Sequence, residues 1–441
     1  MSVEQIHLLI SRELKAGTHP SDLHDLVEEL DIEQKVELLE RLTDSDAALI
    51  LQEMENYVQA DILPLLSKEQ AREILKNLAS DDAADLIGEL SPEEAEEMLQ
   101  LISEEEEPVD LSDLLKYPEE SAGGIMTTEY ISLPADIPVE DAISRLREIA
   151  PEAETIYYVY VVNEEGQLIG VLSLRDLIAA TDGTVLKNIM RRNVISVNAE
   201  LDQEEVARVV SKYDLLAVPV VDDQERLLGI ITVDDVIDVL EQEATEDIYR
   251  LAGASEVEGM ELTEAPVGKV VRLRLPWLLI SMAGGILSGS VIGVYRNTLE
   301  AIVMLAIFIP VIMGMGGNVG TQSSTIFVRG LATGEIDRSE VWSYFFREIR
   351  VGLTMGVICG ALISVIAYIW QGNSYLGLVV GISMLITISV ATLIGTLVPL
   401  LLNKANIDPA ITAGPFVTTI KDFTGLIIYF IIASAFLEYL R

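Results

Sequence analysis

The chain has 441 residues, among them 29 Lys or Arg and 71 Asp or Glu, and a formal net charge of −42. That length leaves room for about three domains, and the charge is divided unevenly: residues 1–271 hold 19 basic and 63 acidic side chains, whereas residues 272–441 hold 10 and 8. So acidic a first part argues against nucleic acid or anionic lipid as its partner and favours divalent counter-ions, although solubility alone explains some of the surplus.

Cysteine and histidine usage narrows the possible chemistry. Cys359 is the single cysteine and lies in an apolar segment, so the sequence indicates neither an intrachain disulfide nor an oxidising compartment. The three histidines lack the cysteine partners and spacing of a zinc site. Residues 1–6 lack the basic stretch and apolar core of a signal peptide, so we expect the acidic part to remain in the cytoplasm.

Residues 1–120 are expected to form an acidic, all-α domain whose short helices wind into a superhelix. Three residue pairs fit an N-cap and its capping-box partner: Asp31 with Gln34, Ser67 with Gln70, and Ser91 with Glu94. Leucines at helical spacing follow them, in units close to 24 residues long, as in a helical array. Asp81, Asp82 and Asp85 open one helix, where they either favour the helix dipole or sense a cation.

Residues 121–242 contain an internal duplication. Ile125–Leu133 is echoed 64 residues later by Ile189–Val197, and Ile169–Ile178 is echoed by Leu228–Ile237. Runs rich in β-branched and aromatic residues lie within each copy and predict strands. The pattern resembles a tandem pair of CBS domains, which are α/β modules of β-α-β-β-α order that usually work as a twin.

The CBS resemblance implies a nucleotide site. Such modules often bind adenosine nucleotides through a Gly-x-x-Ser/Thr-x-Ser/Thr-Asp signature. The residues that match it are Gly170, Ser173 and Asp176 in the first copy, and Gly229, Thr232 and Asp235 in the second. Arg175 and Asp234 occupy the second hydroxyl position and depart from the signature. ATP or another adenine nucleotide is the implied ligand.

Residues 243–271 connect this pair to an apolar region, and they continue an amphipathic, acidic pattern that begins near Val236. The pattern predicts a connecting helix that leads to the membrane, although a solvated linker is an equally good explanation. Together with the acids at 81, 82 and 85, the candidate cation ligands here are Asp234, Asp235, Asp238, Glu241, Glu243, Glu246, Asp247 and Glu258.

Residues 272–441 are expected to form an α-helical membrane domain of five spans, near 275–296, 300–328, 347–370, 376–402 and 411–439. Each is long enough to cross a hydrocarbon layer of about 30 Å. Basic residues gather in alternate loops, so the positive-inside rule places those loops and the N-terminus in the cytoplasm and the C-terminus outside. Trp277, Trp342 and Trp370 fall near span ends, as in an interfacial belt.

The second predicted span contains polar side chains that a helix facing only lipid would not need. Pro310 and four glycines share this span with Asn318, Thr321, Gln322 and two serines, and no charge occurs before Arg329. Glycines in a membrane helix permit close approach of another helix or of an ion. Tight helix packing and an ion path are both compatible with this stretch.

The last span contains Asp422, about eleven residues from its start and hence roughly 16 Å deep. A bare charge at that depth costs on the order of 3 kcal/mol or more, so it should face a cavity or a partner. Thr418, Gly425 and Tyr429 lie at helical spacing from Asp422, on one face. That face suits a partly hydrated cation; neutralisation by the neighbouring Lys421 is the alternative.

An acidic helical domain, twin CBS modules, a connecting helix and five spans, in this order, resemble the MgtE family of magnesium channels. The strongest local matches are Gly316–Ser323, Asp408–Ala410 with Gly414–Pro415, and Thr419 with Asp422. The resemblance implies a homodimer whose second and fifth spans line one pore, with Asp422 as the selectivity carboxylate that binds Mg²⁺ through its water shell. The other implied pore residues are Asn318, Thr321, Gln322, Thr325, Thr418 and Thr419.

We expect a mechanism in which Mg²⁺ binding to the acidic region relieves repulsion, draws the domains together and closes the pore. Two alternatives stay open: another divalent cargo such as Co²⁺ or Mn²⁺, or a non-conducting membrane sensor whose CBS pair reads adenylates. The sequence predicts no enzyme, because it contains neither a phosphate-binding glycine loop that ends in Lys-Ser/Thr nor a nucleophile–base motif.

Overall fold

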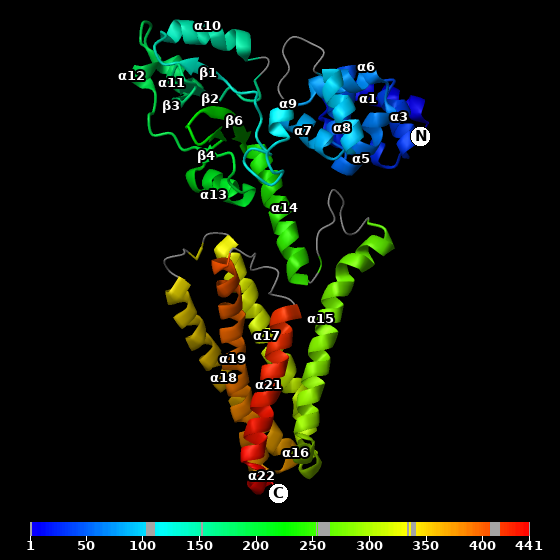
Figure 1. The fold of residues 1–441 in the computed structure, drawn as a ribbon, viewed down its shortest axis with the longest axis vertical. Helices are drawn as coiled ribbons and strands as arrows, with labels where there is room; N and C mark the ends of the chain where they lie inside the picture. Colours follow the sequence, from blue (N-terminus) through cyan, green and yellow to red (C-terminus); the bar gives the residue numbers. More distant parts are fainter. Residues whose placement is uncertain are drawn as a thin grey trace. The chain divides into compact units, whose positions relative to one another are not determined.

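The computed structural model of the chain describes residues 2–102, 111–150, 153–252, 254, 265–332, 335–336, 341–405 and 415–440 (Figure 1). The contacts divide it into two compact units, Met1–Gln242 and the part that begins at Glu243. The predicted fold class is confirmed: short helices come first, a duplicated α/β module follows, and five long apolar helices complete the described chain.

Short helices build the N-terminal part of the first unit. They are α1 (Val3–Lys15), η1 (Pro20–Leu23), α2 (His24–Glu28), α3 (Ile32–Leu39), α4 (Asp44–Gln52), α5 (Asn56–Ile62), η2 (Leu63–Leu65), α6 (Lys68–Asn77), α7 (Ser80–Gly88), α8 (Pro92–Ile102) and α9 (Leu111–Leu114). All three predicted caps are confirmed, because the side chains of Asp31, Ser67 and Ser91 each accept a hydrogen bond from the backbone N–H three residues later.

The two halves of the duplication fold alike. The first contains β1 (Ser132–Pro134), α10 (Val139–Ile149), β2 (Tyr158–Val162), β3 (Leu168–Ser173) and α11 (Leu174–Ala179), and α12 (Leu186–Ile189) links it to the second. The second contains β4 (Val197–Asn198), α13 (Gln203–Tyr213), β5 (Ala217–Val221), β6 (Leu227–Thr232) and α14 (Val233–Ala252). In both sheets the middle strand pairs parallel with the first strand and antiparallel with the third.

The repeated glycines allow the repeated Ile-Met segments to pack. A Cβ added to Gly170 would overlap the side chain of Met190, and one added to Gly229 would lie 2.6 Å from Thr127 O and 2.8 Å from Met126 Sδ. The apolar core extends from the short helices into the second module, where Val218, Val220 and Ile231 are buried. These glycines therefore serve packing within the module pair.

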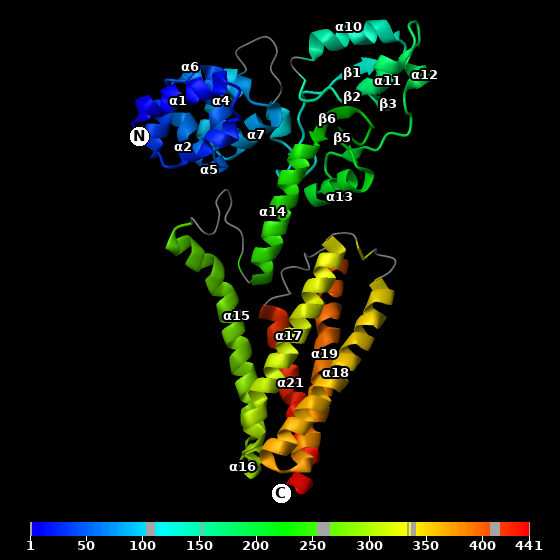
Figure 2. The same ribbon diagram turned by 180° about the vertical axis from the view of Figure 1, so that it is seen from behind.

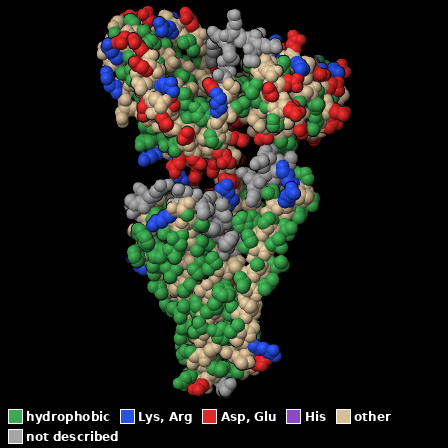
Figure 3. Space-filling model, viewed as in Figure 1, with side chains coloured by type: hydrophobic (Ala, Val, Ile, Leu, Met, Phe, Trp, Pro, Cys, Tyr) green, Lys and Arg blue, Asp and Glu red, His purple; other side chains and the backbone are tan. Residues whose placement is uncertain are grey.

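The second unit contains five described helices that are long and apolar enough to cross a membrane. They are α15 (Val267–Val294), α17 (Leu305–Ala332), α18 (Val341–Gln371), α19 (Ser374–Lys404) and α21 (Pro415–Ala435), with the short helices α16 (Arg296–Ala301) and α22 (Leu437–Leu440) at one end. Two opposite views show α18 beside α19, with the chain ending near α16 (Figures 1 and 2). Hydrophobic side chains cover most of this unit's visible surface (Figure 3).

The observed helices differ from the predicted spans mainly at their ends. α15 begins eight residues before predicted position 275, and α16 is a separate helix across the start predicted for the second span. α17 runs continuously through Pro310 and the glycines. Trp342 and Trp370 are exposed near the two ends of α18, as the interfacial belt predicts.

Glycines bring α18 and α19 together. A Cβ at Gly360 would lie 2.7 Å from Gly381 O, and a Cβ at Gly356 would lie 2.8 Å from Leu385 O. Small residues let two membrane helices approach backbone to backbone, where dispersion is strongest. α19 in turn contacts α17 and α21, so it is the centre on which the polar helices are placed.

Candidate functional site

Asp422 lies on α21, which packs against α15, α17 and α19. Its side chain is half-buried, as is Thr418 one turn earlier. Further along the same face the helix is closed: Gly425 contacts Thr387 of α19, and the hydroxyl of Tyr429 donates to Leu305 O at 2.8 Å. Only the end of the predicted polar face that carries Thr418 and Asp422 is therefore accessible.

The predicted polar residues of α17 occupy more than one face. Gly314, Asn318 and Gln322 are spaced four residues apart and exposed, so the described chain leaves this stripe uncovered. Thr321 and Thr325 are half-buried. Gly316 lies on the inner side, where a Cβ would be 3.0 Å from Thr387 Cγ2.

Lys421 turns into the helix bundle. Its Nζ donates to Gly317 O at 2.7 Å and to Thr321 Oγ1 at 3.1 Å, and the residue is 2 % exposed. Within the described chain no ion pair joins it to Asp422. The structure therefore does not support the alternative in which Lys421 neutralises Asp422 by direct contact.

Thr419, another predicted pore residue, packs against α15. A Cβ at Gly284 of α15 would overlap the Thr419 side chain, so a glycine is needed for this contact. Thr419 thus has a packing role, and its neighbour Thr418 is half-buried as well. The predicted matches at Asp408–Ala410 and Gly414 lie outside the described residues.

Sequence reasoning missed a second carboxylate within the membrane helices. Glu348 of α18 is 7 % exposed, and Ser323 Oγ of α17 donates to its Oε2 at 3.2 Å. Glu348 stands between Arg347 and Arg350 at the predicted edge of a span, where an acid looks interfacial. The signal that could have found it is its helical spacing to the buried glycines at 352 and 356.

Five acids of the first unit gather around α7. Asp81, Asp82 and Asp85 come from its first two turns, Asp235 from α14, and Glu154 from the segment before β2. We call these five residues the acidic cluster. Ser80 places α7 here, because its hydroxyl accepts from Thr128 N at 2.9 Å and lies 3.1 Å from Thr127 Oγ1.

Burial and mutual repulsion make the acidic cluster unfavourable when fully charged. Burial, then the charges of Asp235 and Asp82, raise the pKa of Asp81 to about 8. Burial and neighbouring acids likewise raise the pKa of Asp82 to about 6 and that of Asp85 to about 7. The pKa of Asp235 and that of Glu154 are also raised, chiefly by burial.

The acidic cluster contains carboxylate oxygens that could bind a cation, but they are not arranged around one point. Asp81 Oδ1 is buried and has no hydrogen-bond partner among the described atoms, whereas Gln52 Nε2 donates to Asp82 Oδ2 at 2.5 Å. No three Asp, Glu, His or Cys side chains in the described ranges converge closely enough to hold a metal ion. Carboxylate oxygens suit Mg²⁺, which keeps several of its waters.

The other predicted acids lie along α14 or outside the described residues. Asp234, Asp238 and Glu241 are exposed on this helix. The partial burial of Asp238, followed by the charge of Glu241, raises the pKa of Asp238. Glu246 forms an ion pair with Arg250 one turn later. Glu243 and Asp247 are half-buried on the same helix, and Glu258 lies outside the described residues.

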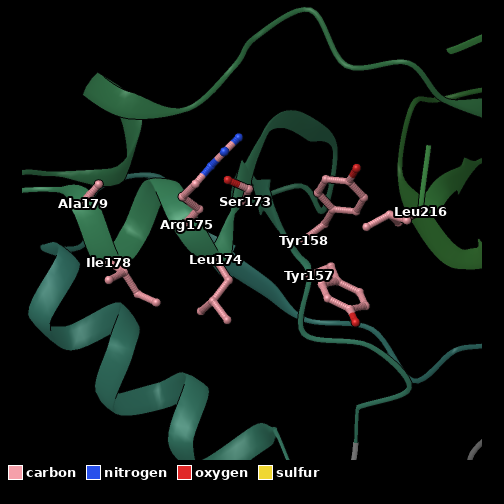
Figure 4. A pocket seen from close by; sticks show the side chains of 8 residues that line it. All are labelled: Tyr157, Tyr158, Ser173, Leu174, Arg175, Ile178, Ala179 and Leu216. Carbon is pink, nitrogen blue, oxygen red and sulfur yellow. The ribbon is translucent and has the colours of Figure 1, made fainter. Parts of the chain in front are cut away.

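A cavity of about 600 Å³ opens where the first module meets the second (Figure 4). Its lining residues are Tyr157, Tyr158, Ser173, Leu174, Arg175, Ile178, Ala179 and Leu216. The Tyr157 and Tyr158 rings lie across from Ile178, with Arg175 beside Ser173 (Figure 4). The arrangement combines flat apolar surface with one guanidinium.

The two predicted nucleotide sets differ in their surroundings. Ser173 lines the cavity, and its hydroxyl donates to Asp176 Oδ2 at 2.6 Å, so Asp176 supports Ser173. Thr232 is buried and donates to Asp235, which belongs to the acidic cluster. Tyr157 and Tyr158 were missed by sequence reasoning, because the motif carries no information about residues outside it. Arg175 lies within the motif but was interpreted only as a departure from the signature.

Comparison with known proteins finds matches over most of the chain. Residues 309–432 match a family described as divalent cation transporter, residues 18–120 an MgtE intracellular N domain, and residues 122–183 and 186–242 a CBS domain. The magnesium transporter MgtE of Bacillus subtilis is 43% identical over 326 residues, 74% of this chain and 71% of that protein. The magnesium transporter MgtE of Thermus thermophilus is 44% identical over 329 residues, 75% of this chain and 73% of that protein.

Among solved structures, similarity extends to the cytosolic domain of the Mg²⁺ channel MgtE in complex with ATP. It is 42% identical and covers 52% of this chain and 93% of that one, with a TM-score of 0.48.

Proposed function

The chain belongs to the MgtE family of magnesium transporters, and on this premise we propose that two copies form a Mg²⁺-selective channel into the cytoplasm, closed by cytosolic Mg²⁺. The observation that carries the proposal is the half-buried Asp422 carboxylate on α21, with Lys421 turned toward α17. A carboxylate left accessible in a membrane helix needs water or a cation. Mg²⁺ dehydrates reluctantly, so Asp422 holds it through its water shell.

The uncovered stripe of α17 supports a homodimer. Asn318 and Gln322 are exposed on a helix otherwise suited to lipid. Polar amides in hydrocarbon lack hydrogen-bond partners, so the stripe needs a water-filled passage or a second copy. A pore shared by two α17 helices supplies both. Asn318, Gln322 and Thr325 then line the pore with Thr418 and Asp422, while Thr321 and Thr419 support the wall.

Basic residues support the orientation. Arg272 and Arg274 near the start of α15, Arg347 and Arg350 near the start of α18, and Lys404 at the end of α19 occupy the same end of the helix unit (Figure 1). By the positive-inside rule this end is cytoplasmic and the C-terminus lies outside. A negative-inside membrane potential then drives a dication inward, at about 2.3 kcal/mol per charge per 100 mV.

The acidic cluster and the acids of α14 are the proposed closing site. Uncompensated carboxylates repel one another, and a dication that binds among them favours whichever state brings them together. Asp81 Oδ1, which is buried and has no hydrogen-bond partner in the described part of the chain, supports this assignment. Because no three-acid group is preformed among the described residues, binding must involve rearrangement, a second copy, or retained waters.

The cavity of the first CBS module is the proposed adenine-nucleotide site. Tyr157 and Tyr158 provide ring surface for a base, and Arg175 provides a charge for phosphate. In the second module the counterpart of Asp176 is Asp235, which belongs to the acidic cluster. A nucleotide there would face carboxylates.

Mg²⁺ flux into liposomes that contain the full chain tests the proposal. Asp422→Asn keeps the shape but loses the charge, so we expect at least about a tenfold loss of Mg²⁺ flux, whereas Glu438→Gln at the exposed end of α22 should conduct normally. Measuring Co²⁺ and Mn²⁺ in parallel identifies the cargo. Wild-type chain that passes no divalent ion would favour the non-conducting sensor instead.

A further inference from the structure

Lys421 is a buried cation for which helix packing gives no reason. It is 2 % exposed, and its Nζ contacts two neutral oxygens, Gly317 O and Thr321 Oγ1. Burying an ammonium against neutral groups is less favourable than burying an apolar side chain of the same size. An arrangement of this kind calls for a role of the charge itself.

The opposite helix provides the space for this side chain. A Cβ at Gly320 of α17 would overlap Lys421 Cδ and lie 2.9 Å from Nζ, so a larger residue there would displace the lysine. Ala391 O of α19 closes the same space at 3.0 Å from that Cβ position. The ammonium on α21 is thus held against α17 by two hydrogen bonds, in a space that Gly320 leaves open.

A fixed ammonium next in sequence to Asp422 changes how that carboxylate binds a cation. Neighbouring charges interact more strongly in a protein interior than in water, because the interior screens them less. The positive charge therefore weakens the attraction between Asp422 and a dication without occupying the carboxylate. A conducting site must hold an ion strongly enough to select it and weakly enough to release it.

We propose that Lys421 is a specificity-determining residue of the transport path, a fixed countercharge that lowers the affinity of Asp422 for Mg²⁺ so that the ion is released onward. The inference rests on the proposed role of Asp422. It assigns the lysine to the release step and the aspartate to selection. Gly317 and Thr321 act through Lys421 by accepting hydrogen bonds from its ammonium, and Gly320 leaves the space for the side chain.

The test compares Lys421→Met with Lys421→Gln in the full chain, with Mg²⁺ flux into liposomes measured against external Mg²⁺ concentration. Met removes charge and hydrogen bonds, whereas Gln removes the charge and keeps an N–H donor. In both variants the half-saturating Mg²⁺ concentration should fall about tenfold or more, and the maximal flux should fall with it. Lys404→Met removes a like charge beside Trp342 and should leave the half-saturating concentration unchanged.

The Gln variant protects the test against simple misfolding, because it retains a donor toward Gly317 O. A folded Lys421→Gln protein with an unchanged or raised half-saturating concentration would overturn the inference. Asp422→Asn, measured alongside, separates the two proposals: normal flux in that variant refutes the role of Asp422 itself. Loss of flux there, with wild-type saturation in the lysine variants, refutes only the role of Lys421.

Discussion

At the scale of single residues, Asp81 links proton binding to the stability of the first unit. Its pKa is raised to about 8 by burial and by Asp235 and Asp82, against about 4 for an Asp in an unfolded chain. The folded unit therefore binds more protons than the unfolded chain between these values, so its stability falls as pH rises from about 4 to about 8. Asp82 and Asp85 act in the same direction.

We predict that Asp81→Asn stabilises the unit Met1–Gln242 at pH 8 and flattens its pH dependence. The neutral amide removes the unfavourable charge, a gain on the order of 2 kcal/mol or more at pH 8 and little at pH 5. Thermal unfolding in a chelator at both pH values measures it, with Glu164→Gln in an exposed turn as the control. Equal melting temperatures of wild type and Asp81→Asn at pH 8 would contradict the prediction.

Single residues also mark the limit of sequence reasoning. The type and depth of Asp422 could be read from the chain, because a carboxylate within an apolar segment is conspicuous. The direction of Lys421 could not, since it depends on Gly320, which lies about a hundred residues away on another helix. Glu348 was missed because the neighbouring arginines indicate an exposed position at a span end, whereas packing buries its side chain.

At the scale of elements, the sequence predicted where helices and strands lie better than which of them pack together. N-caps at Asp31, Ser67 and Ser91 located helix starts, because a cap needs only neighbours in sequence. The duplication predicted two equal modules for the same reason. Which surfaces meet is a property of the assembled fold: Leu216, which precedes β5, completes a cavity whose other walls come from β2, β3 and α11.

That cavity gives a prediction for nucleotide binding. Arg175→Ala should weaken ATP binding about tenfold or more, because a guanidinium facing phosphate makes charge-assisted hydrogen bonds worth about 1.5–3 kcal/mol. Calorimetric titration of the unit Met1–Gln242 with ATP measures the affinity. Arg145→Ala, on the exposed side of α10, should bind ATP as the wild type does. Equal affinity of Arg175→Ala and wild type would place the nucleotide elsewhere.

At the scale of the whole molecule, charged residues are distributed unevenly along the chain. The first 271 residues carry 63 of the 71 acids, and the five long helices that follow carry few charges. Composition and span length were enough to predict this order of parts. The separate helix α16 and the uncovered stripe of α17 were beyond sequence reasoning, because both depend on how helices end and pack in space.

If Mg²⁺ closes the channel through the acidic region, removing that region must remove the response. We predict that a chain lacking residues 1–250 conducts Mg²⁺ whether cytosolic Mg²⁺ is low or high, since its ion path on α17 and α21 is intact. Flux is measured in liposomes with the cytosolic side at micromolar and millimolar Mg²⁺.

A full-length chain that carries Asp81→Asn, Asp82→Asn and Asp85→Asn together distinguishes the loss of these charges from the loss of the whole region. These amides remove the repulsion that Mg²⁺ would otherwise relieve, so this chain should conduct less than wild type at low Mg²⁺ and respond little to added Mg²⁺. A truncated chain that still closes as Mg²⁺ rises would move the sensor into the membrane helices. If the triple variant closes at the same Mg²⁺ concentration as the wild type, the aspartates of α7 are not the sensor. The acids of α14 are then the site to test.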